Sequence, residues 1–384
     1  MIYLDNHATT ACDPRVVEAM LPYFLTSYGN PGSPHALGLQ AAAAVATARE
    51  QVAYLLGAEP AEIVFTSGAT EANNLAILGA ARQHAKSGGQ RRRILVSAIE
   101  HKSVLEPCEH LASKGWEVVI LPVNARGVLE WEDAERLVNE QTLLVCLQAA
   151  NSEIGTLQDV GRMAELAHRH GALLYCDAAQ AVGKVMVDVT QWPVDLLGLS
   201  AHKFYGPKGV GALYVRDGAR DQPLMPLVWG GSQEYGLRPG TVPVPLVVGL
   251  GAACKLAQGA MGEEMQRVQG LRQRLEDHIL GALPRTWVNG DVGNRLPHNS
   301  SLTFQGIEAE ALLANLNTVA ISMGAACESG SLDPSRVLLQ IRMSNEDAFC
   351  TVRLGLGRFT TESEVDRAGD EIVTAVQRLE ALFA

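Results

Sequence analysis

The sequence lacks three features that mark specialised classes of protein. No Cys-x-x-Cys pair occurs among the seven cysteines, so zinc-ribbon spacing is absent and we expect no metal site. The N-terminal stretch MIYLDNHATT has neither the basic segment nor the apolar core of a secretion signal. The longest weakly polar run, residues 242–254, is too short to span a bilayer. We therefore expect a cytoplasmic protein with reduced thiols and no membrane segment.

Positive charge is also scarce. Lys and Arg total 31 against 42 Asp and Glu, which gives a net charge of −11. Proteins that bind nucleic acid along a basic face carry the opposite balance, so direct nucleic-acid binding is not expected. The basic cluster at residues 91–93 precedes a predicted strand and is interpreted as a solvated loop. Hydrophobic residues make up 47% of the 384 residues, enough for a large core in a soluble protein.

Apolar runs alternate with amphipathic stretches from about residue 16 to about residue 255. Strands are predicted at residues 62–67, 93–99, 117–123, 142–150, 172–178, 195–202 and 210–215. Helical patterns separate many of them. Continuous apolar strands separated by helices indicate an α/β fold, with a mostly parallel sheet covered by helices on both faces.

The pattern changes after about residue 256. A charged helix is predicted at residues 263–283, followed by a strand, shorter helices and an amphipathic helix that closes the chain. We expect a large domain at residues 15–257. A smaller α+β domain would combine residues 1–14 with residues 258–384.

One strand end carries a candidate anion site. The sequence FTSGATEANN places Ala69 and Thr70 at a turn from a strand into a helix. Unpaired backbone amides and the helix dipole favour an anion at such a turn, although an ordinary N-cap uses the same residue types. Ligands of parallel sheets bind beyond the carboxyl ends of the strands.

Two more strand ends carry an acid and a lysine. Asp177 ends the strand LLYCD, where a carboxylate is costly to bury unless it is paired or caps a helix. Lys203 follows the strand DLLGLS, with Ser200 and His202 beside it. A lysine in a cleft is a candidate for Schiff-base chemistry, whereas a lone lysine at a strand end more often lies on the surface.

The three motifs together are more specific than any one of them. Pyridoxal 5'-phosphate (PLP) requires a lysine, a carboxylate for its pyridine nitrogen and an anion site for its phosphate. The competing nucleotide motifs fail, because GVGALY and GLGAAC lack the third glycine and no GxxxxGK[ST] occurs. The sequence therefore predicts PLP as the cofactor.

At this point the chain resembles the cysteine desulfurases, fold-type-I PLP-dependent enzymes similar to the class V aminotransferases. The resemblance covers essentially the whole chain. The motifs that carry it are YLDNHATT, YGNPGSPHALG, EIVFTSGATEANNLAI, EHKSVL, ANSEIGTLQD, DAAQAVGK, SAHKFYGPKGVGALYV, RPGTVP and VRLGLGRFTTESEVD.

The resemblance implies a role for each matching residue. Lys203 would bind the cofactor covalently, Asp177 would pair with the pyridine nitrogen, and Gln180 would face the ring hydroxyl. His101 would stack on the ring and act as acid and base, since imidazole titrates near neutrality. The remaining cofactor contacts would come from Ala69, Thr70, Asn151, Ser200 and His202. Thr241 would reach the phosphate of the neighbouring subunit, which implies a homodimer.

The substrate implied by the resemblance is L-cysteine, which would be converted to L-alanine. Arg353 would clamp the substrate carboxylate, and Asn30 and Asn151 would line the same pocket. Cys327, in the Gly-, Ala- and Ser-rich stretch GAACESGS, would take the sulfur as a persulfide and pass it to an acceptor protein. Relatives often carry Ser-Gly-Ser-Ala-Cys-Thr here, whereas Glu328 follows the thiol in this chain and disfavours its thiolate.

Several alternatives stay open at the level of sequence. The same scaffold supports selenocysteine lyases and cysteine or cystine C–S lyases, which need no loop thiol. A non-catalytic subunit that only binds a partner is disfavoured, because the predicted catalytic and binding residues are all present, namely Lys203, Asp177, His101 and Arg353. The acceptor would belong to iron–sulfur cluster assembly or to tRNA or DNA thiolation. Cys350, which lies close to Arg353 in sequence, is interpreted as a packed core residue.

Overall fold

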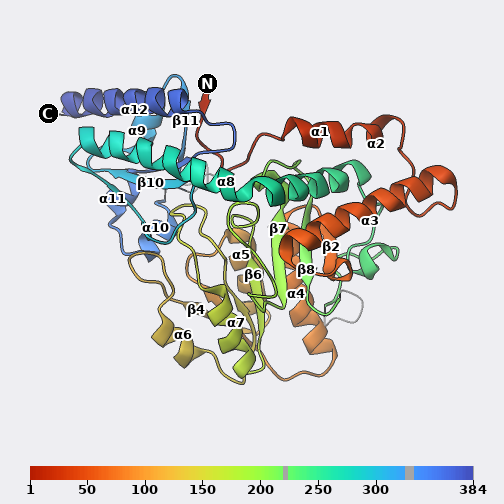
Figure 1. Cartoon of the computed structure of the whole chain (residues 1–384). Coiled ribbons are helices and arrows are strands. Elements are labelled where there is room, and N and C mark those ends of the chain that lie inside the picture. The colour runs from red at the N-terminus through yellow and green to blue at the C-terminus, as the bar shows by residue number, and fades with distance from the viewer. Residues whose placement is uncertain (219–223, 325–332, 384) are drawn as a thin grey trace.

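The structure is a computed structural model that describes residues 1–218, 224–324 and 333–383 (Figure 1). Its central sheet has seven strands in the order β2-β8-β7-β6-β5-β3-β4. Their bounds are β2 (Ile63–Thr66), β3 (Arg93–Ser97), β4 (Glu117–Leu121), β5 (Thr142–Cys146), β6 (Leu173–Asp177), β7 (Leu196–Ser200) and β8 (Gly211–Val215). Only β8 runs antiparallel to its neighbours, so the predicted α/β fold with a mostly parallel sheet is confirmed.

Helices cover both faces of this sheet, because successive side chains of each buried strand point to opposite faces. In β5, Val145 belongs to one hydrophobic core, while Leu144 and Cys146 belong to the other. Helices α4 (Ala69–Lys86) and α5 (Lys102–Ala112) pack on the face of Leu144. The opposite face is covered by α3 (Ala36–Leu56), α6 (Trp131–Leu137), α7 (Val160–Arg169) and the first half of α8 (Val244–Ala282).

The second part of the chain builds a separate hydrophobic core around a four-stranded sheet of order β12-β13-β10-β9. Its elements are β9 (Thr286–Val288), β10 (Asn299–Phe304), α9 (Ala309–Ala314), β12 (Ser322–Met323), α10 (Arg336–Gln340), α11 (Asn345–Phe349), β13 (Thr351–Gly355) and α12 (Glu362–Phe383). The N-terminal strand β1 (Ile2–Tyr3) pairs in parallel with β11 (Val319–Ala320). The first strand of the chain therefore pairs with the second part, and the predicted grouping of residues 1–14 with residues 258–384 stays a prediction.

Helix α8 (Val244–Ala282) joins the two parts as one continuous helix. The sequence predicts a helix only at residues 263–283, but the helix begins directly after Pro243. The first half of α8 packs Val247, Leu250 and Cys254 into the core of the large sheet, and the second half contributes to the core around β10. Figure 1 shows α8 running along both parts. The domain boundary at residues 257–258 stays a prediction, because α8 runs straight through it.

Among the described residues, α8 is also the one helix long and apolar enough to cross a membrane. Length and composition are weak indicators, since core helices of soluble proteins share them. In α8 a large share of the apolar stretch is buried inside the protein, against α3 and α1 (Pro14–Met20). Packing inside the protein therefore accounts for part of the apolar composition of α8.

Several short helices are not predicted from the sequence. They are α1, α2 (Pro22–Leu25), α6 and α11. Each is too short for an apolar repeat to be recognised. Local capping defines two of them, because the side chains of Asp13 and Ser344 accept backbone N–H groups at the starts of α1 and α11.

Candidate active site

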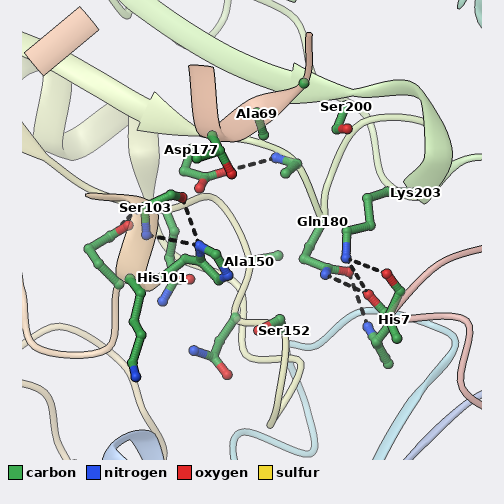
Figure 2. Close-up of a pocket in the computed structure, with 18 of the residues that line it drawn as sticks. His7, Ala69, His101, Ser103, Ala150, Ser152, Asp177, Gln180, Ser200 and Lys203 are labelled. Carbon is green, nitrogen blue, oxygen red and sulfur yellow. Dashed lines mark hydrogen bonds between the residues drawn. The ribbon is translucent and has the colours of Figure 1, made fainter. Parts of the chain in front are cut away.

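A cavity of about 440 Å³ lies beyond the carboxyl ends of β2, β3, β5, β6 and β7. These strands all end at one edge of the sheet, so the residues that follow them meet there. Figure 2 shows His101, Asp177, Gln180 and Lys203 arranged around this space. The predicted site residues that line it are Ala69, Thr70, His101, Asn151, Asp177, Gln180, Ser200, His202, Lys203 and Arg353.

The turn from β2 into α4 forms one wall of the cavity. Gly68 has φ +149° and ψ −179°, a conformation that essentially only glycine adopts. No side chain caps the start of α4, so its first backbone N–H groups are available to an anion. Ser200 lies close by, since a Cβ at Gly68 would be 3.5 Å from its Oγ. Amides, a hydroxyl and a helix N-terminus are the donors that a phosphate requires.

Asp177 lies at the end of β6 and is largely buried. Its Oδ1 accepts the backbone N–H of Ala179 at 2.9 Å, and its Oδ2 accepts from Asn73 Nδ2 at 2.9 Å. The hydroxyl of Tyr175 donates to Asn73 Oδ1, which fixes the Asn73 amide with its nitrogen toward the acid. The carboxylate is therefore held in one orientation at the cavity wall.

His101 is the N-cap residue of α5. Its Nδ1 accepts the backbone N–H of Ser103 at 3.1 Å and lies 2.7 Å from Ser103 Oγ. Ser103 Oγ in turn accepts from Asn73 Nδ2 at 2.7 Å. Because Nδ1 acts as an acceptor, the neutral ring carries its proton on Nε2. The histidine thus caps a helix and lines the cavity, and Asn73 links it to Asp177.

Lys203 closes a short 3₁₀ turn, Ala201–Lys203, directly after β7. Its Nζ donates to the carbonyl oxygens of His7 at 2.6 Å and Ala8 at 2.9 Å. Figure 2 shows Lys203 and His7 side by side. The N-terminal segment therefore reaches into the cavity and places two acceptors beside the lysine.

Arg353, on β13, closes the cavity from the second part of the chain. It is almost fully buried, and its Nη2 donates to Asp5 Oδ1 at 3.0 Å and to Ser322 Oγ at 2.9 Å. Its Nη1 donates to the carbonyls of Ser152 and Gly324 at 3.1 and 3.2 Å. Its buried Nε has no hydrogen-bond partner among the described residues. A substrate carboxylate would supply an acceptor for this arginine.

Two predicted site residues among the described ones do not line this cavity, namely Asn30 and Thr241. Asn30 is exposed in the connection between α2 and α3, and its Oδ1 accepts the backbone N–H of Gly32 at 2.9 Å. Thr241 is exposed before α8 and does not line the cavity of its own chain. Cys327 lies outside the described residues. The predicted contacts of Asn30 with this pocket are therefore not found within the single chain.

Burial shifts the pKa of two groups that line the cavity. Burial, followed by the charges of Lys203 and Lys208, lowers the pKa of His202 to about 4 from its ordinary 6.5. His202 is therefore neutral at physiological pH, with Nδ1 3.1 Å from Thr9 Oγ1. Burial, reinforced by the charge of Asp177, raises the pKa of Glu100 well above its ordinary value. Glu100 Oε1 accepts the backbone N–H of Gln148 at 2.5 Å.

Sequence reasoning missed His7, Asn73 and Glu100 as parts of the site. Each had a local signal. His7 lies inside the motif YLDNHATT, and Glu100 directly precedes His101. Asn73 is a polar residue on the apolar face of a predicted helix, where an amide requires a buried partner.

The residues present fit PLP on their own chemistry. An uncapped helix N-terminus suits a phosphate, a fixed carboxylate suits a protonated pyridine nitrogen, and Lys203 lies at the same cavity. The fold and the site are those of a PLP-dependent enzyme. The family model described as aminotransferase class-V matches residues 2–368. The chain therefore belongs to the class-V aminotransferase family.

Relatives and solved structures support this grouping. The chain is 43% identical to "Cysteine desulfurase IscS" of Rickettsia felis, over 99% of this chain and 92% of that protein. It is 44% identical to the human "Cysteine desulfurase", over 98% and 82% of the two chains. A solved "NifS-like protein" superposes with a TM-score of 0.91 at 35% identity, covering 98% of this chain and 99% of the other. Within the class-V family, the chain therefore belongs to the cysteine desulfurases.

One similar solved structure contains bound cysteine. It is described as "SspA in complex with cysteine" and superposes with a TM-score of 0.82 at 36% identity. The match covers 94% of this chain and all of that chain. The fungal relative from Arthroderma benhamiae, named "Cysteine desulfurase, mitochondrial", is 46% identical over all of this chain and 76% of that protein.

Proposed function

We propose that this chain converts L-cysteine to L-alanine and carries the removed sulfur as a persulfide on Cys327. The convergence of Lys203, Asp177, His101 and Arg353 on one cavity with an anion site is the observation that carries the proposal. PLP, when bound, draws electrons from the carbon beside the substrate's amino nitrogen. Asp177 would hold its pyridine nitrogen protonated, and the start of α4 with Ser200 and His202 would hold its phosphate.

The chain's own residues would move the protons and the sulfur. Lys203 Nζ takes the proton from the α-carbon of cysteine, and Nε2 of His101 exchanges the proton of the substrate thiol. Arg353 binds the substrate carboxylate. The Cys327 thiolate attacks the substrate sulfur, so a sulfur–sulfur bond forms while the carbon–sulfur bond breaks. The β-carbon keeps that electron pair and takes up a proton, and Lys203 Nζ returns a proton to the α-carbon, which gives alanine.

Replacing Cys327 with serine tests the proposed route of the sulfur. Persulfide on the protein should disappear in mass spectra, and alanine release should fall by at least about a hundredfold, because the nucleophile is lost. The matched control is Cys350→Ser, since Cys350 is buried, as the sequence predicts, and burial raises its pKa. A Cys327→Ser enzyme that still consumed its substrate at the wild-type rate would instead indicate a lyase that needs no loop thiol, acting on cysteine, cystine or selenocysteine.

We also propose that the enzyme is a homodimer in which Thr241 reaches the phosphate site of the neighbouring subunit. The exposure of Thr241 outside its own cavity supports this arrangement. Large apolar side chains also lie exposed between α1 and α2, on α2 and in the segment after it, namely Leu21, Phe24, Leu25 and Tyr28. Analytical ultracentrifugation tests the proposal. A sedimentation coefficient that corresponds to a monomer at micromolar protein concentration would contradict it.

The proposed compartment is the cytoplasm, and the proposed partner is a sulfur-acceptor protein. The described cysteines are all free thiols, which suits a reducing compartment. The acceptor would act in iron–sulfur cluster assembly or in tRNA or DNA thiolation. Incubation with cysteine that carries radioactive sulfur, followed by capture of the labelled proteins, would identify the acceptor. Label that stays on the enzyme would contradict the existence of an acceptor protein.

A further inference from the structure

His7 is a buried histidine at the edge of the cavity, and no role has been assigned to its ring. Its side chain is fully buried and stacks on the ring of His298, with centroids 4.3 Å apart and an angle of 25° between the planes. Its Nδ1 lies 3.1 Å from Gln180 Oε1, and its Nε2 lies 3.0 Å from Asn299 Nδ2. The ring therefore bridges the small-domain strand β10 and the residue predicted to face the cofactor ring.

The surrounding hydrogen bonds allow only one tautomer of His7. Asn299 Nδ2 also donates to the carbonyl of Glu153 at 3.0 Å, which fixes it as the nitrogen end of that amide. Nε2 of His7 must then be an acceptor, so the proton lies on Nδ1. Burial, followed by the charge of Arg353, lowers the pKa of His7 well below its ordinary value, which keeps the ring neutral.

The fixed tautomer in turn sets the amide of Gln180. Nδ1–H of His7 donates to Gln180 Oε1, while Gln180 Nε2 donates to the His7 carbonyl at 3.2 Å. A flipped Gln180 would place its oxygen against that carbonyl and its nitrogen against an N–H, so both bonds would be lost. Figure 2 shows these two residues joined in this way beside Lys203. The second hydrogen of Gln180 Nε2 remains for a group in the cavity.

We propose that His7 is a positioning residue that holds Gln180 with an N–H directed at the ring oxygen of the cofactor. This inference rests on the proposed function, in which Gln180 faces that oxygen. An N–H donor stabilises the ionised oxygen, and so lowers the pH at which the lysine-bound cofactor loses its proton. Loss of the N–H donor therefore raises the pH midpoint of this deprotonation.

Titration of the visible absorbance of the bound cofactor tests the proposal without any measurement of activity. His7→Phe keeps a ring to stack on His298 but cannot donate to Gln180. We expect its absorbance midpoint to rise by about one pH unit, as expected for one hydrogen bond to a charged oxygen. Gln180→Leu should give the same rise. The double variant should rise no further than Gln180→Leu alone, because His7 acts through Gln180.

His298→Phe is the matched control, since both nitrogens of His298 are buried without a partner among the described residues. It should leave the midpoint unchanged. The proposal is overturned if His7→Phe binds the cofactor with an unchanged midpoint, or if His298→Phe moves it equally. If His7→Phe does not fold, nitrogen-15 spectra of the wild-type holoenzyme with labelled histidine show which ring nitrogen of His7 carries the proton. A proton on Nε2 overturns the proposal. Wild-type protein without visible absorbance would instead contradict the proposed function.

Discussion

Replacing Lys203 with alanine is expected to lower alanine production from L-cysteine by at least about a thousandfold. The substitution removes both the covalent anchor of the cofactor and the amine that takes the α-proton. The carbonyl oxygens of His7 and Ala8 hold Nζ of Lys203 in place, and an alanine side chain has no amine to put at that position. Alanine release and the visible absorbance of the purified protein measure the two losses separately.

Lys208 supplies the control for this substitution. It also lines the cavity, but it is exposed and follows the short turn that carries Lys203. Lys208→Ala removes the same charge and should keep the visible absorbance. Loss of that absorbance in Lys208→Ala but not in Lys203→Ala would contradict the assignment of Lys203.

Asp177→Asn is expected to reduce turnover by at least about a hundredfold while leaving the protein folded. An asparagine cannot supply the negative charge that a protonated pyridine nitrogen requires. Its amide also fits poorly, because both carboxylate oxygens of Asp177 accept N–H groups, one from Ala179 and one from Asn73. One of these donors would face the amide nitrogen of the variant. Steady-state kinetics and thermal melting separate the chemical loss from any loss of stability.

Asp195→Asn provides the comparison, because Asp195 also accepts two hydrogen bonds. Its Oδ2 accepts the backbone N–H of Leu174 at 2.7 Å and lies 2.9 Å from His168 Nε2. Asp195 precedes β7, at the opposite end of that strand from Lys203, and does not line the cavity. We expect Asp195→Asn to melt at a lower temperature with near-normal turnover. Equal turnover losses in the two variants would show that a general structural effect explains the Asp177 result.

The fold was predictable because strands and helices leave periodic patterns over many residues. Continuous apolar runs such as TLLVC predicted strands, and their carboxyl ends brought Asp177 and Lys203 together. The beginning of α8 was missed, because its first turns are apolar and glycine-rich and so lack a periodic polar face.

The residues that line the candidate site were predictable from strand ends and from resemblance, but the hydrogen-bond partners of the residues behind them were not. Asn73 is bound to Asp177 and Ser103, which lie far from it in sequence. The partner of His7 is Gln180, and only the folded chain shows that contact. Hydrogen bonds between distant segments leave no local spacing pattern, so a sequence alone does not indicate them.

The continuity of α8 has a thermodynamic consequence. One rigid helix contributes side chains to both hydrophobic cores, so neither core can come apart without disrupting the helix that supports the other. The two parts should therefore unfold cooperatively in a single transition. A ligand bound at the edge of the large sheet would then also stabilise the four-stranded sheet that carries Arg353.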